Sequence, residues 1–338
     1  MLTELNDLPE HFLDLEARDL HRILVGPTLI HLPGRRDEPL FVSILLHGNE
    51  DTGLKAIQAV LKKYQNQPLP RSISLFIGNV AAALKGLRRL DNQPDYNRVW
   101  SADDNESLLP EHHLMRNVVG IMAKRRVFAS IDIHNNTGLN PHYGCVNRLD
   151  DAFLQLATLF SRIVVYFTNP KGVQSEAFAK ICPAVTLECG KTGGMGGVEH
   201  AASFVDAVLH LSNLPNHPVA NHDLDLFHTV AVVKVAERVS LGVGDESAGL
   251  NLKADIDYYN FRELLPGTQL ATVTSGTTLP LQAWDEAGND IGADYFEING
   301  KALVNRRTVM PAMLTRDVGI IRQDCLCYLM ERLERKGK

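Results

Sequence analysis

The first two thirds of the chain alternate short apolar runs with segments of helical periodicity. The apolar runs are rich in β-branched residues and almost continuous, which is typical of strands covered on both faces. They lie at residues 40–46, 73–77, 127–133, 163–167 and 184–187. Segments with one apolar helical face lie between or after them, at residues 54–64, 117–123, 153–160 and 198–211. This alternation predicts an α/β fold with a mostly parallel mixed sheet flanked by helices.

The pattern changes after residue 211. Residues 212–223 are rich in Pro, Asn and His and have no periodicity, which predicts a connection. Further strands separated by turn residues are expected at residues 229–235, 269–273, 281–284 and 301–304. We therefore expect two domains. Residues 1–211 would form the larger one, with residues 1–38 as an N-terminal extension, and residues 224–338 would form a smaller β-rich C-terminal domain.

Composition and charge narrow the class of protein. Hydrophobic residues make up 45% and charged residues 22% of the 338 positions, as in ordinary globular proteins. The net charge of −6 does not suit a nucleic-acid-binding domain. No apolar run approaches the roughly 20 residues that span a bilayer, and the acidic start does not resemble a signal peptide. We therefore expect neither nucleic-acid nor membrane partners. The five scattered cysteines fit reduced thiols, which predicts a cytoplasmic protein.

Two residues that suit a metal ion follow the first apolar run. His47 and Glu50 stand three positions apart, just past residues 40–46. In parallel sheets, ligands collect outside the carboxyl ends of the strands. An imidazole nitrogen and a carboxylate oxygen suit zinc. The pair alone is a weak signal, because a loop histidine beside a helix start, with Glu50 favoured by the helix dipole, explains it equally well.

A second apolar run, residues 127–133, leads into His134 in the same way. Two histidines and one glutamate form a ligand set of catalytic zinc, which leaves a further coordination position for water or substrate. Asp132 points to the same side of the strand as His134. It can therefore orient the imidazole through a hydrogen bond, although a polar group at a strand end is an equal alternative.

A third run, residues 184–187, is followed by Glu188 and a glycine-rich stretch. Hydrolysis at zinc needs a base for water and an acid for the leaving group. A glutamate that does not bind the metal can serve as both. The alternative, an edge-strand glutamate in solvent, fits poorly beside so apolar a run.

Four short motifs occur in a characteristic order. They are His47-Gly-Asn-Glu50, the segment from Arg88-Arg-Leu-Asp91 to Asn97-Arg98, Asp132-Ile-His134-Asn, and Leu187-Glu188-Cys-Gly190. This set resembles the succinylglutamate desuccinylase/aspartoacylase family, zinc amidohydrolases related to the metallocarboxypeptidases. The resemblance covers residues 40–205, and a thinner match around Tyr295 extends it into the C-terminal domain. It implies a zinc carboxypeptidase-like fold whose second domain caps the site.

The resemblance also implies roles for the residues in these motifs. His47, Glu50 and His134 would bind one zinc ion per chain. Glu188 would be the general base and acid. Arg88 would polarise the scissile carbonyl, a role that needs a fixed cation where negative charge develops.

Substrate binding follows from the same resemblance. Asn97 and Arg98 match a pair that binds a substrate carboxylate, for which a guanidinium group offers bidentate geometry. Tyr295 matches a tyrosine that reaches the substrate from the C-terminal domain. Arg88 and Arg89 are adjacent, so the motif does not decide which of them enters the site. Residues 177–183 lack the arginine that aspartoacylases use for a second carboxylate. The resemblance therefore predicts the hydrolytic residues better than it predicts the substrate.

The sequence thus favours a zinc-dependent hydrolase that cleaves the amide bond of an N-acyl amino acid. Its substrate would be a small molecule, or a short peptide, with a free carboxylate. One alternative is a metallocarboxypeptidase-like peptidase that acts on short or modified peptides. A second is a zinc-binding module without catalysis, against which the presence of Glu188 argues. The sequence does not determine the acyl group or the amino acid. It also leaves the oligomeric state open, with a homo-oligomer as one option.

Overall fold

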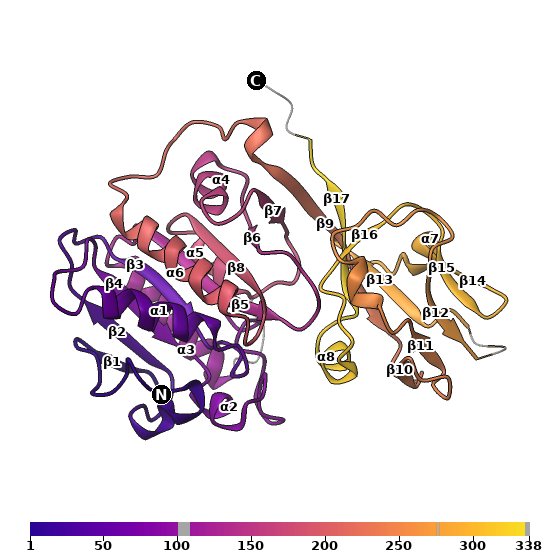
Figure 1. Cartoon of the computed structure of the whole chain (residues 1–338), viewed down its shortest axis with the longest axis horizontal. Coiled ribbons are helices and arrows are strands. Elements are labelled where there is room, and N and C mark those ends of the chain that lie inside the picture. The colour runs from indigo at the N-terminus through magenta and orange to yellow at the C-terminus, as the bar shows by residue number, and fades with distance from the viewer. Residues whose placement is uncertain (101–108, 275, 277, 335–338) are drawn as a thin grey trace. The chain divides into compact units, whose positions relative to one another are not determined.

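The computed structural model describes residues 1–100, 109–274, 276 and 278–334. The chain divides into two compact units (Figure 1). The first unit contains residues 1–135, 142–166 and 170–225. The second contains residues 136–141, 167–169 and 226–338. Two short segments of the first two thirds of the chain thus belong to the second unit, which no local sequence pattern indicated.

The first unit is built around a mixed sheet. Its strands are β1 (Thr3–Leu5), β2 (Thr28–Leu32), β3 (Leu40–Ile44), β4 (Ile73–Ile77), β5 (Ala129–Asn136), β6 (Tyr143–Val146), β7 (Ile163–Tyr166) and β8 (Ala184–Lys191). They are arranged in the order β1-β2-β4-β3-β5-β8-β6-β7. β3 pairs in parallel with β4 and β5, as do β1 with β2 and β6 with β7. The pairs β2–β4 and β6–β8 are antiparallel, so the predicted mixed, mostly parallel sheet is confirmed.

Helices flank this sheet. They are α1 (Thr52–Lys63), α2 (Val80–Lys85), α3 (Pro110–Ala123), α4 (Asp151–Thr158), α5 (Gln174–Phe178), α6 (Met195–His210) and the 3-10 helices η1 (Ala17–Arg22) and η2 (Asn221–Asp223). α1 and α6 pack side by side, and α4, α5 and α6 contact β8 (Figure 1). Every residue of β3, β4 and β5 is buried. Strands covered on both faces explain why these segments read as almost continuous apolar runs.

The parallel strands bring their carboxyl ends to one edge of the sheet. Ile44 of β3 lies opposite Ile77 of β4, and Ser43 lies opposite Asp132 of β5. β5 and β8 continue beyond the apolar runs that predicted them, so His134 and Glu188 lie inside these strands and not after them. The reason is that backbone pairing, which does not depend on side-chain polarity, sets where a strand ends.

The N-terminal residues are part of the sheet. Residues 1–38, expected as an extension, contribute β1, η1 and β2 to the first unit. β2 pairs antiparallel with β4, where His31 lies opposite Ser74. This segment therefore covers an edge of the parallel strands, an arrangement that single-strand periodicity does not reveal.

The second unit is rich in β-structure, as expected. Its strands are β9 (Asp225–Val235), β10 (Leu241–Val243), β11 (Leu250–Leu252), β12 (Gln269–Val273), β13 (Leu281–Asp285), β14 (Phe296–Asn299), β15 (Ala302–Asn305), β16 (Met310–Ala312) and β17 (Cys327–Arg332). Its helices are η3 (Ile256–Tyr259), α7 (Gly292–Tyr295) and α8 (Val318–Gln323). β10-β11-β12-β15-β14 form one sheet, while β9 pairs with β13 and β17, and β17 with β16.

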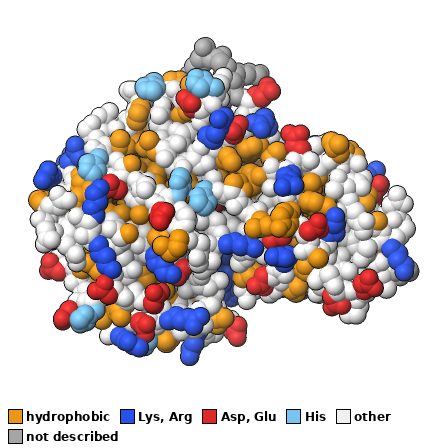
Figure 2. All heavy atoms as spheres, in the orientation of Figure 1, with side chains coloured by type: hydrophobic (Ala, Val, Ile, Leu, Met, Phe, Trp, Pro, Cys, Tyr) orange, Lys and Arg blue, Asp and Glu red, His pale blue; other side chains and the backbone are white. Residues whose placement is uncertain are grey.

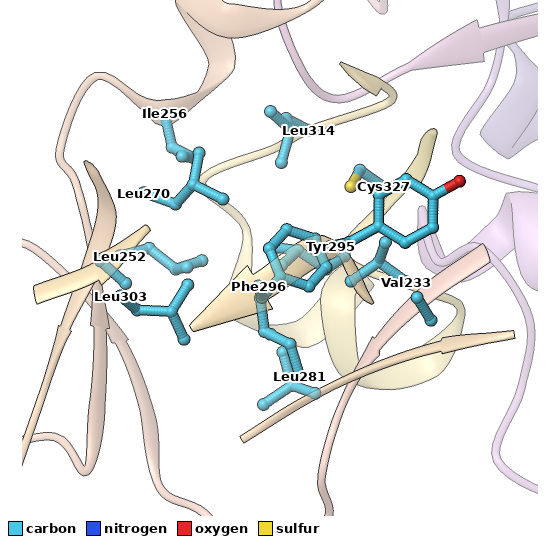
Figure 3. Packing of buried hydrophobic residues seen from close by; sticks show 14 of the residues in the cluster. Val233, Leu252, Ile256, Leu270, Leu281, Tyr295, Phe296, Leu303, Leu314 and Cys327 are labelled. Atoms are coloured by element: carbon cyan, nitrogen blue, oxygen red, sulfur yellow. The ribbon is translucent and has the colours of Figure 1, made fainter. Parts of the chain in front are cut away.

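The core of the second unit consists of side chains from both sets of strands. Figure 3 shows Leu252, Leu270 and Leu303 grouped on one side of the Phe296 ring. Val233 of β9 and Leu281 of β13 belong to the same cluster. One continuous apolar core therefore holds this unit together.

The surface carries both signs of charge. Figure 2 shows acidic and basic side chains intermixed on the visible face. No helix in the described part of the chain is long and apolar enough to cross a membrane. The cysteines are buried and free of disulfides, at Cys145, Cys182, Cys189, Cys325 and Cys327.

Candidate active site

Three buried side chains converge at the carboxyl edge of the first sheet. His47 and Glu50 lie between β3 and α1, and His134 lies on β5; their exposed fractions are 3%, 6% and 3%. The Glu50 carboxylate bridges the rings, with Oε1 2.8 Å from His47 Nδ1 and Oε2 2.8 Å from His134 Nδ1. The backbone N–H of Asn135 donates to Oε2 at 3.1 Å. The ligand atoms of the three residues lie within 4.8 Å of one another, so they can hold a metal ion.

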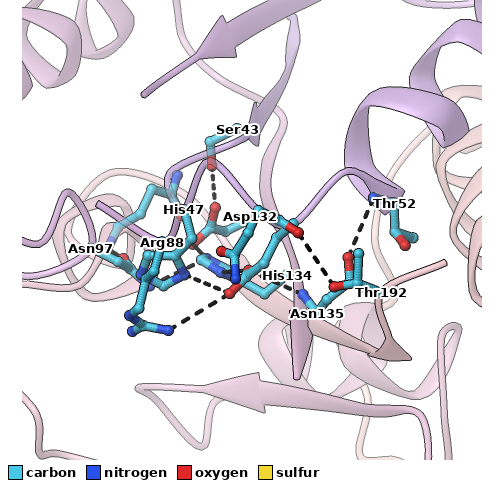
Figure 4. Close-up of polar contacts among 12 residues, drawn as sticks. Ser43, His47, Thr52, Arg88, Asn97, Asp132, His134, Asn135 and Thr192 are labelled. Carbon is cyan, nitrogen blue, oxygen red and sulfur yellow. Dashed lines mark hydrogen bonds and ion pairs between the residues drawn. The ribbon is translucent and has the colours of Figure 1, made fainter. Parts of the chain in front are cut away.

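The second nitrogen of each imidazole contacts another carboxylate (Figure 4). His134 Nε2 donates to Asp132 Oδ2 at 2.7 Å, and His47 Nε2 donates to Asp95 Oδ1 at 3.0 Å. A carboxylate only accepts, so it holds a proton on Nε2, and a cation between Glu50 and the two rings would take the place of the Nδ1 protons and be bound by the Nδ1 lone pairs. Ser43 Oγ donates to Asp132 Oδ1 at 2.7 Å and fixes this buried carboxylate in turn.

The electrostatics of these side chains favour a cation. Burial and the charge of Arg88 lower the pKa of His47, but Glu50 and Asp95 outweigh them and raise that pKa above its usual value. Burial likewise lowers the pKa of His134, yet Asp132 and Glu50 raise it well above the usual range. Burial would raise the pKa of Glu50, and the two histidines hold it well below its usual range. The carboxylates thus create a negative potential at the two Nδ1 atoms.

Asp95 is a site residue that the sequence analysis missed. Its Oδ2 accepts hydrogen bonds from Arg88 Nη2 at 3.0 Å and Nε at 3.3 Å, in addition to the contact of Oδ1 with His47. The backbone N–H of Asn97 also donates to Oδ1, at 2.8 Å. The available signal was weak: Asp95 is one acidic residue in a loop without periodicity, two positions before Asn97.

The geometry favours Arg88 over Arg89. Arg88 Nη1 lies 3.7 Å from Glu50 Oε1, so its guanidinium group is next to the proposed metal ligands. Arg89 Nη1 donates to the carbonyl oxygen of Gln93 at 2.7 Å. The side chains of these two adjacent arginines therefore contact different groups, and only that of Arg88 lies beside Glu50.

Asn97 lies against His134. Its Nδ2 is 3.2 Å from His134 Nε2, and its Oδ1 accepts from the backbone N–H of Gln174 at 2.9 Å. Arg98 Nη1 donates to the carbonyl oxygen of Asn97 at 2.8 Å. The two residues that the resemblance assigns to carboxylate binding are therefore tied together, and Asn97 contacts a proposed metal ligand.

Glu188 is a buried residue of β8, with an exposed fraction of 6%, opposite Tyr143 of β6. Burial raises the pKa of the neighbouring Cys189 thiol, and the charges of Glu188 and Glu50 raise it further. Both carboxylates therefore act on the same buried thiol. Asn135 Nδ2 donates to the carbonyl oxygen of Gly190 at 2.9 Å, which ties the end of β8 to the strand that carries His134.

Tyr295 lies in the core of the second unit. Its exposed fraction is 5%, and it belongs to the same apolar cluster as Phe296. The guanidinium carbon of Arg307 lies 4.9 Å from the centre of its ring. These contacts give Tyr295 a packing role within its own unit, and its contact with substrate stays a prediction.

Comparisons with solved structures extend the fold over both units. The chain is similar to succinylglutamate desuccinylase/aspartoacylase from Rhodobacter sphaeroides, with 13% identity, a TM-score of 0.57, and coverage of 90% of this chain and 88% of that one. It is also similar to succinylglutamate desuccinylase from Chromobacterium violaceum, with 16% identity, a TM-score of 0.56, and coverage of 89% of this chain and 86% of that one. Murine aminoacylase 3 is similar as well, with 13% identity, a TM-score of 0.56, and coverage of 88% of this chain and 96% of that one. At these identities the similarity supports the fold alone.

Sequence comparison identifies the family. No curated protein matches the chain in sequence. The model of the succinylglutamate desuccinylase/aspartoacylase catalytic domain, however, matches residues 39–214. This match covers more than half of the chain and contains the segments that bear His47, His134 and Glu188. The chain therefore belongs to the succinylglutamate desuccinylase/aspartoacylase family.

Proposed function

We propose that this protein is a zinc-dependent hydrolase that cleaves the amide bond of an N-acyl amino acid. The observation that carries the proposal is the convergence of His47 Nδ1, His134 Nδ1 and the Glu50 carboxylate, with each Nε2 bound by a further carboxylate. Two imidazole nitrogens and one carboxylate oxygen are a donor set of catalytic zinc sites. Membership of the family supports deacylation as the reaction.

One zinc ion per chain would be held by His47, Glu50 and His134. When bound, zinc would polarise the scissile carbonyl and make water acidic enough to react near neutral pH. Asp95 and Asp132 would keep the two imidazoles in the tautomer that binds a metal.

Glu188 would carry the proton transfers. Its carboxylate takes a proton from the water that attacks the carbonyl carbon, and returns it to the amine nitrogen as the carbon–nitrogen bond breaks. Arg88 would stabilise the negative charge that develops on the carbonyl oxygen. Because Asp95 binds its Nε and Nη2, the guanidinium group is held in position before substrate arrives.

Asn97 and Arg98 would bind the free carboxylate of the substrate. The hydrogen bond from Arg98 to the Asn97 carbonyl oxygen keeps the two groups together. A guanidinium group and an amide N–H suit a carboxylate, so amino-acid derivatives should be preferred over uncharged amides. A contact from Tyr295 to the substrate rests on the family resemblance alone.

The test is a panel of N-acyl amino acids and matching dipeptides, offered to zinc-loaded and to chelator-treated protein. We expect N-acyl amino acids to be hydrolysed by the zinc-loaded form only, with activity restored when zinc is returned. Faster cleavage of dipeptides would favour the metallocarboxypeptidase-like alternative. Zinc binding without turnover of any compound would favour a zinc-binding module.

A further inference from the structure

Gln174 links Asn97 to the strand that carries His134. It is the first residue of α5 and has an exposed fraction of 0%. Its backbone N–H donates to Asn97 Oδ1 at 2.9 Å, and its side-chain Nε2 donates to Ser130 Oγ at 2.7 Å. Ser130 lies on β5, two residues before Asp132 and four before His134, so the three side chains share one face of the strand.

The backbone of Gln174 determines which end of the Asn97 amide faces the site. A backbone N–H can only donate, so the atom that it meets must be Oδ1, and the NH2 group must point toward His134. There Nδ2 lies 3.2 Å from His134 Nε2. This nitrogen already donates to Asp132 and cannot accept from Asn97 at the same time. The NH2 group of Asn97 therefore faces a ring nitrogen that cannot accept a hydrogen bond from it. Its N–H groups stay available to an acceptor atom of a ligand.

The same segment packs on Arg98. Gly172 has a φ of +75°, and a Cβ atom at this position would lie 2.4 Å from the Arg98 carbonyl oxygen. The carbonyl oxygen of Gly172 accepts from the backbone N–H of Trp100 at 3.0 Å. Residues 172–174 thus hold the backbone of Arg98 from one side and the side chain of Asn97 from another.

One polar atom of the Gln174 side chain is unpartnered in the described part of the chain. Its Oε1 is buried and has no hydrogen-bond partner among the described residues. A buried acceptor without a partner destabilises the folded state. Leucine has a similar size and would remove this atom, but it would leave the buried Ser130 Oγ without its hydrogen-bond partner, so only a change at both positions removes every unpaired group.

We propose that Gln174 is a positioning residue for substrate binding, which directs the Asn97 amide and is itself anchored by Ser130. This role rests on the proposed function, because the ligand for the Asn97 N–H groups is the substrate carboxylate. Without the anchor, the first turn of α5 is free to shift, and the amide loses its fixed direction. Affinity for the carboxylate then falls, while the proton transfers at Glu188 are unaffected.

The experiment compares Gln174→Leu, Ser130→Ala and the double variant with wild type. Three experiments are made on each variant: steady-state kinetics (kcat and KM) with an N-acyl amino acid and its methyl amide, calorimetric binding of the same acid to the chelator-treated protein, and urea unfolding. Gln155→Leu is the matched control, because Gln155 lies on α4 and contacts His217 at the surface.

We expect Gln174→Leu to raise KM and the dissociation constant for the acid about tenfold, as for one lost hydrogen bond to a charged group. Its kcat should stay within about twofold of wild type, and the methyl amide should be little affected. Stability toward urea should fall slightly, because the buried Ser130 Oγ loses its hydrogen-bond partner, and should be regained in the double variant, which removes both polar groups. Ser130→Ala should act in the same direction, and the double variant should add little, since both changes remove one interaction. The Gln155→Leu control should match wild type throughout.

An unchanged dissociation constant, equal losses for the acid and its methyl amide, or fully additive effects would overturn the positioning role. If wild-type protein hydrolyses N-acyl amino acids and only Gln174→Leu is without effect, the positioning role falls alone. If wild-type protein neither hydrolyses nor binds these compounds, the proposed function falls as well.

Discussion

The carboxylate of Asp95 binds the imidazole of His47, with Oδ1 3.0 Å from Nε2. Its other oxygen accepts two hydrogen bonds from Arg88. Burial alone would raise the pKa of Asp95, but His47 and Arg88 hold that pKa well below its usual range. One loop carboxylate therefore orients both a proposed metal ligand and a proposed catalytic cation.

Replacing Asp95 by Asn should weaken zinc binding. The change keeps the size of the side chain but removes the charge that holds the proton on His47 Nε2. Loss of such a partner typically lowers metal affinity by about 10- to 100-fold. Competition with a chromophoric chelator measures the effect, with Asp91→Asn, an exposed neighbour, as the control. Wild-type affinity in Asp95→Asn would contradict the assignment.

His134→Ala should abolish stoichiometric metal binding. Wild-type protein should hold about one zinc ion per chain, because three protein ligands suffice for a catalytic site. The variant loses one of the two imidazoles, while most of β5 stays paired. Metal content is measured on the purified proteins, and His142→Ala, outside the cluster, should keep its zinc. Full occupancy in His134→Ala would show that the metal lies elsewhere.

Glu188→Gln should separate chemistry from metal binding. Glutamine has almost the same size as glutamate but cannot take up the proton of water. We expect kcat to fall by roughly 10²- to 10⁴-fold with zinc content unchanged. Steady-state kinetics at saturating substrate, together with metal analysis, provide the measurement. Near-normal turnover would assign the proton transfers to another residue.

Arg98→Lys should impair substrates with a free carboxylate. Lysine keeps the charge but lacks the planar, bidentate guanidinium group. We expect KM to rise by about tenfold, which corresponds to roughly 1.4 kcal/mol. The methyl amide of the same substrate should be little affected. Equal losses on both compounds would mean that Arg98 supports the site structurally and does not bind the carboxylate.

His31 should make the first unit sensitive to acid. Burial, and then the charge of Arg125, lower the pKa of His31 below 6.5, although Glu4 acts in the opposite direction. The unfolded chain then binds a proton at a higher pH than the folded chain, so stability is lost as the pH falls below about 6.5. Urea unfolding at pH 7.5 and 5.5 should show a smaller difference for His31→Gln than for wild type. An equal difference in both proteins would refute this role.

The sequence by itself determined which strands carry the site. Buried strands of a largely parallel sheet have no solvent-facing side, so β3 and β4 are apolar almost throughout, and the apolar runs at residues 127–133 and 184–187 lead into the polar ends of β5 and β8. Polar residues that follow such runs stand out, which singled out His47, His134 and Glu188. The strand ends were less accurate, because backbone pairing continues past the last apolar side chain. Several strands were missed, and most of them are too short for a periodic pattern to show: β1, β2, β6, β10, β11, β14, β16 and the longer β17.

Only the tertiary structure decided how loop residues contribute to the site. It distinguished Arg88 from Arg89, whose side chains have the same chemistry and neighbouring positions. It also brought Asp95 to His47 across 48 residues, and Gln174 to Asn97 across 77. The physical reason is that a loop has no repeating geometry that relates sequence position to side-chain direction. These contacts form only when packing of the strands and helices has fixed the path of each loop.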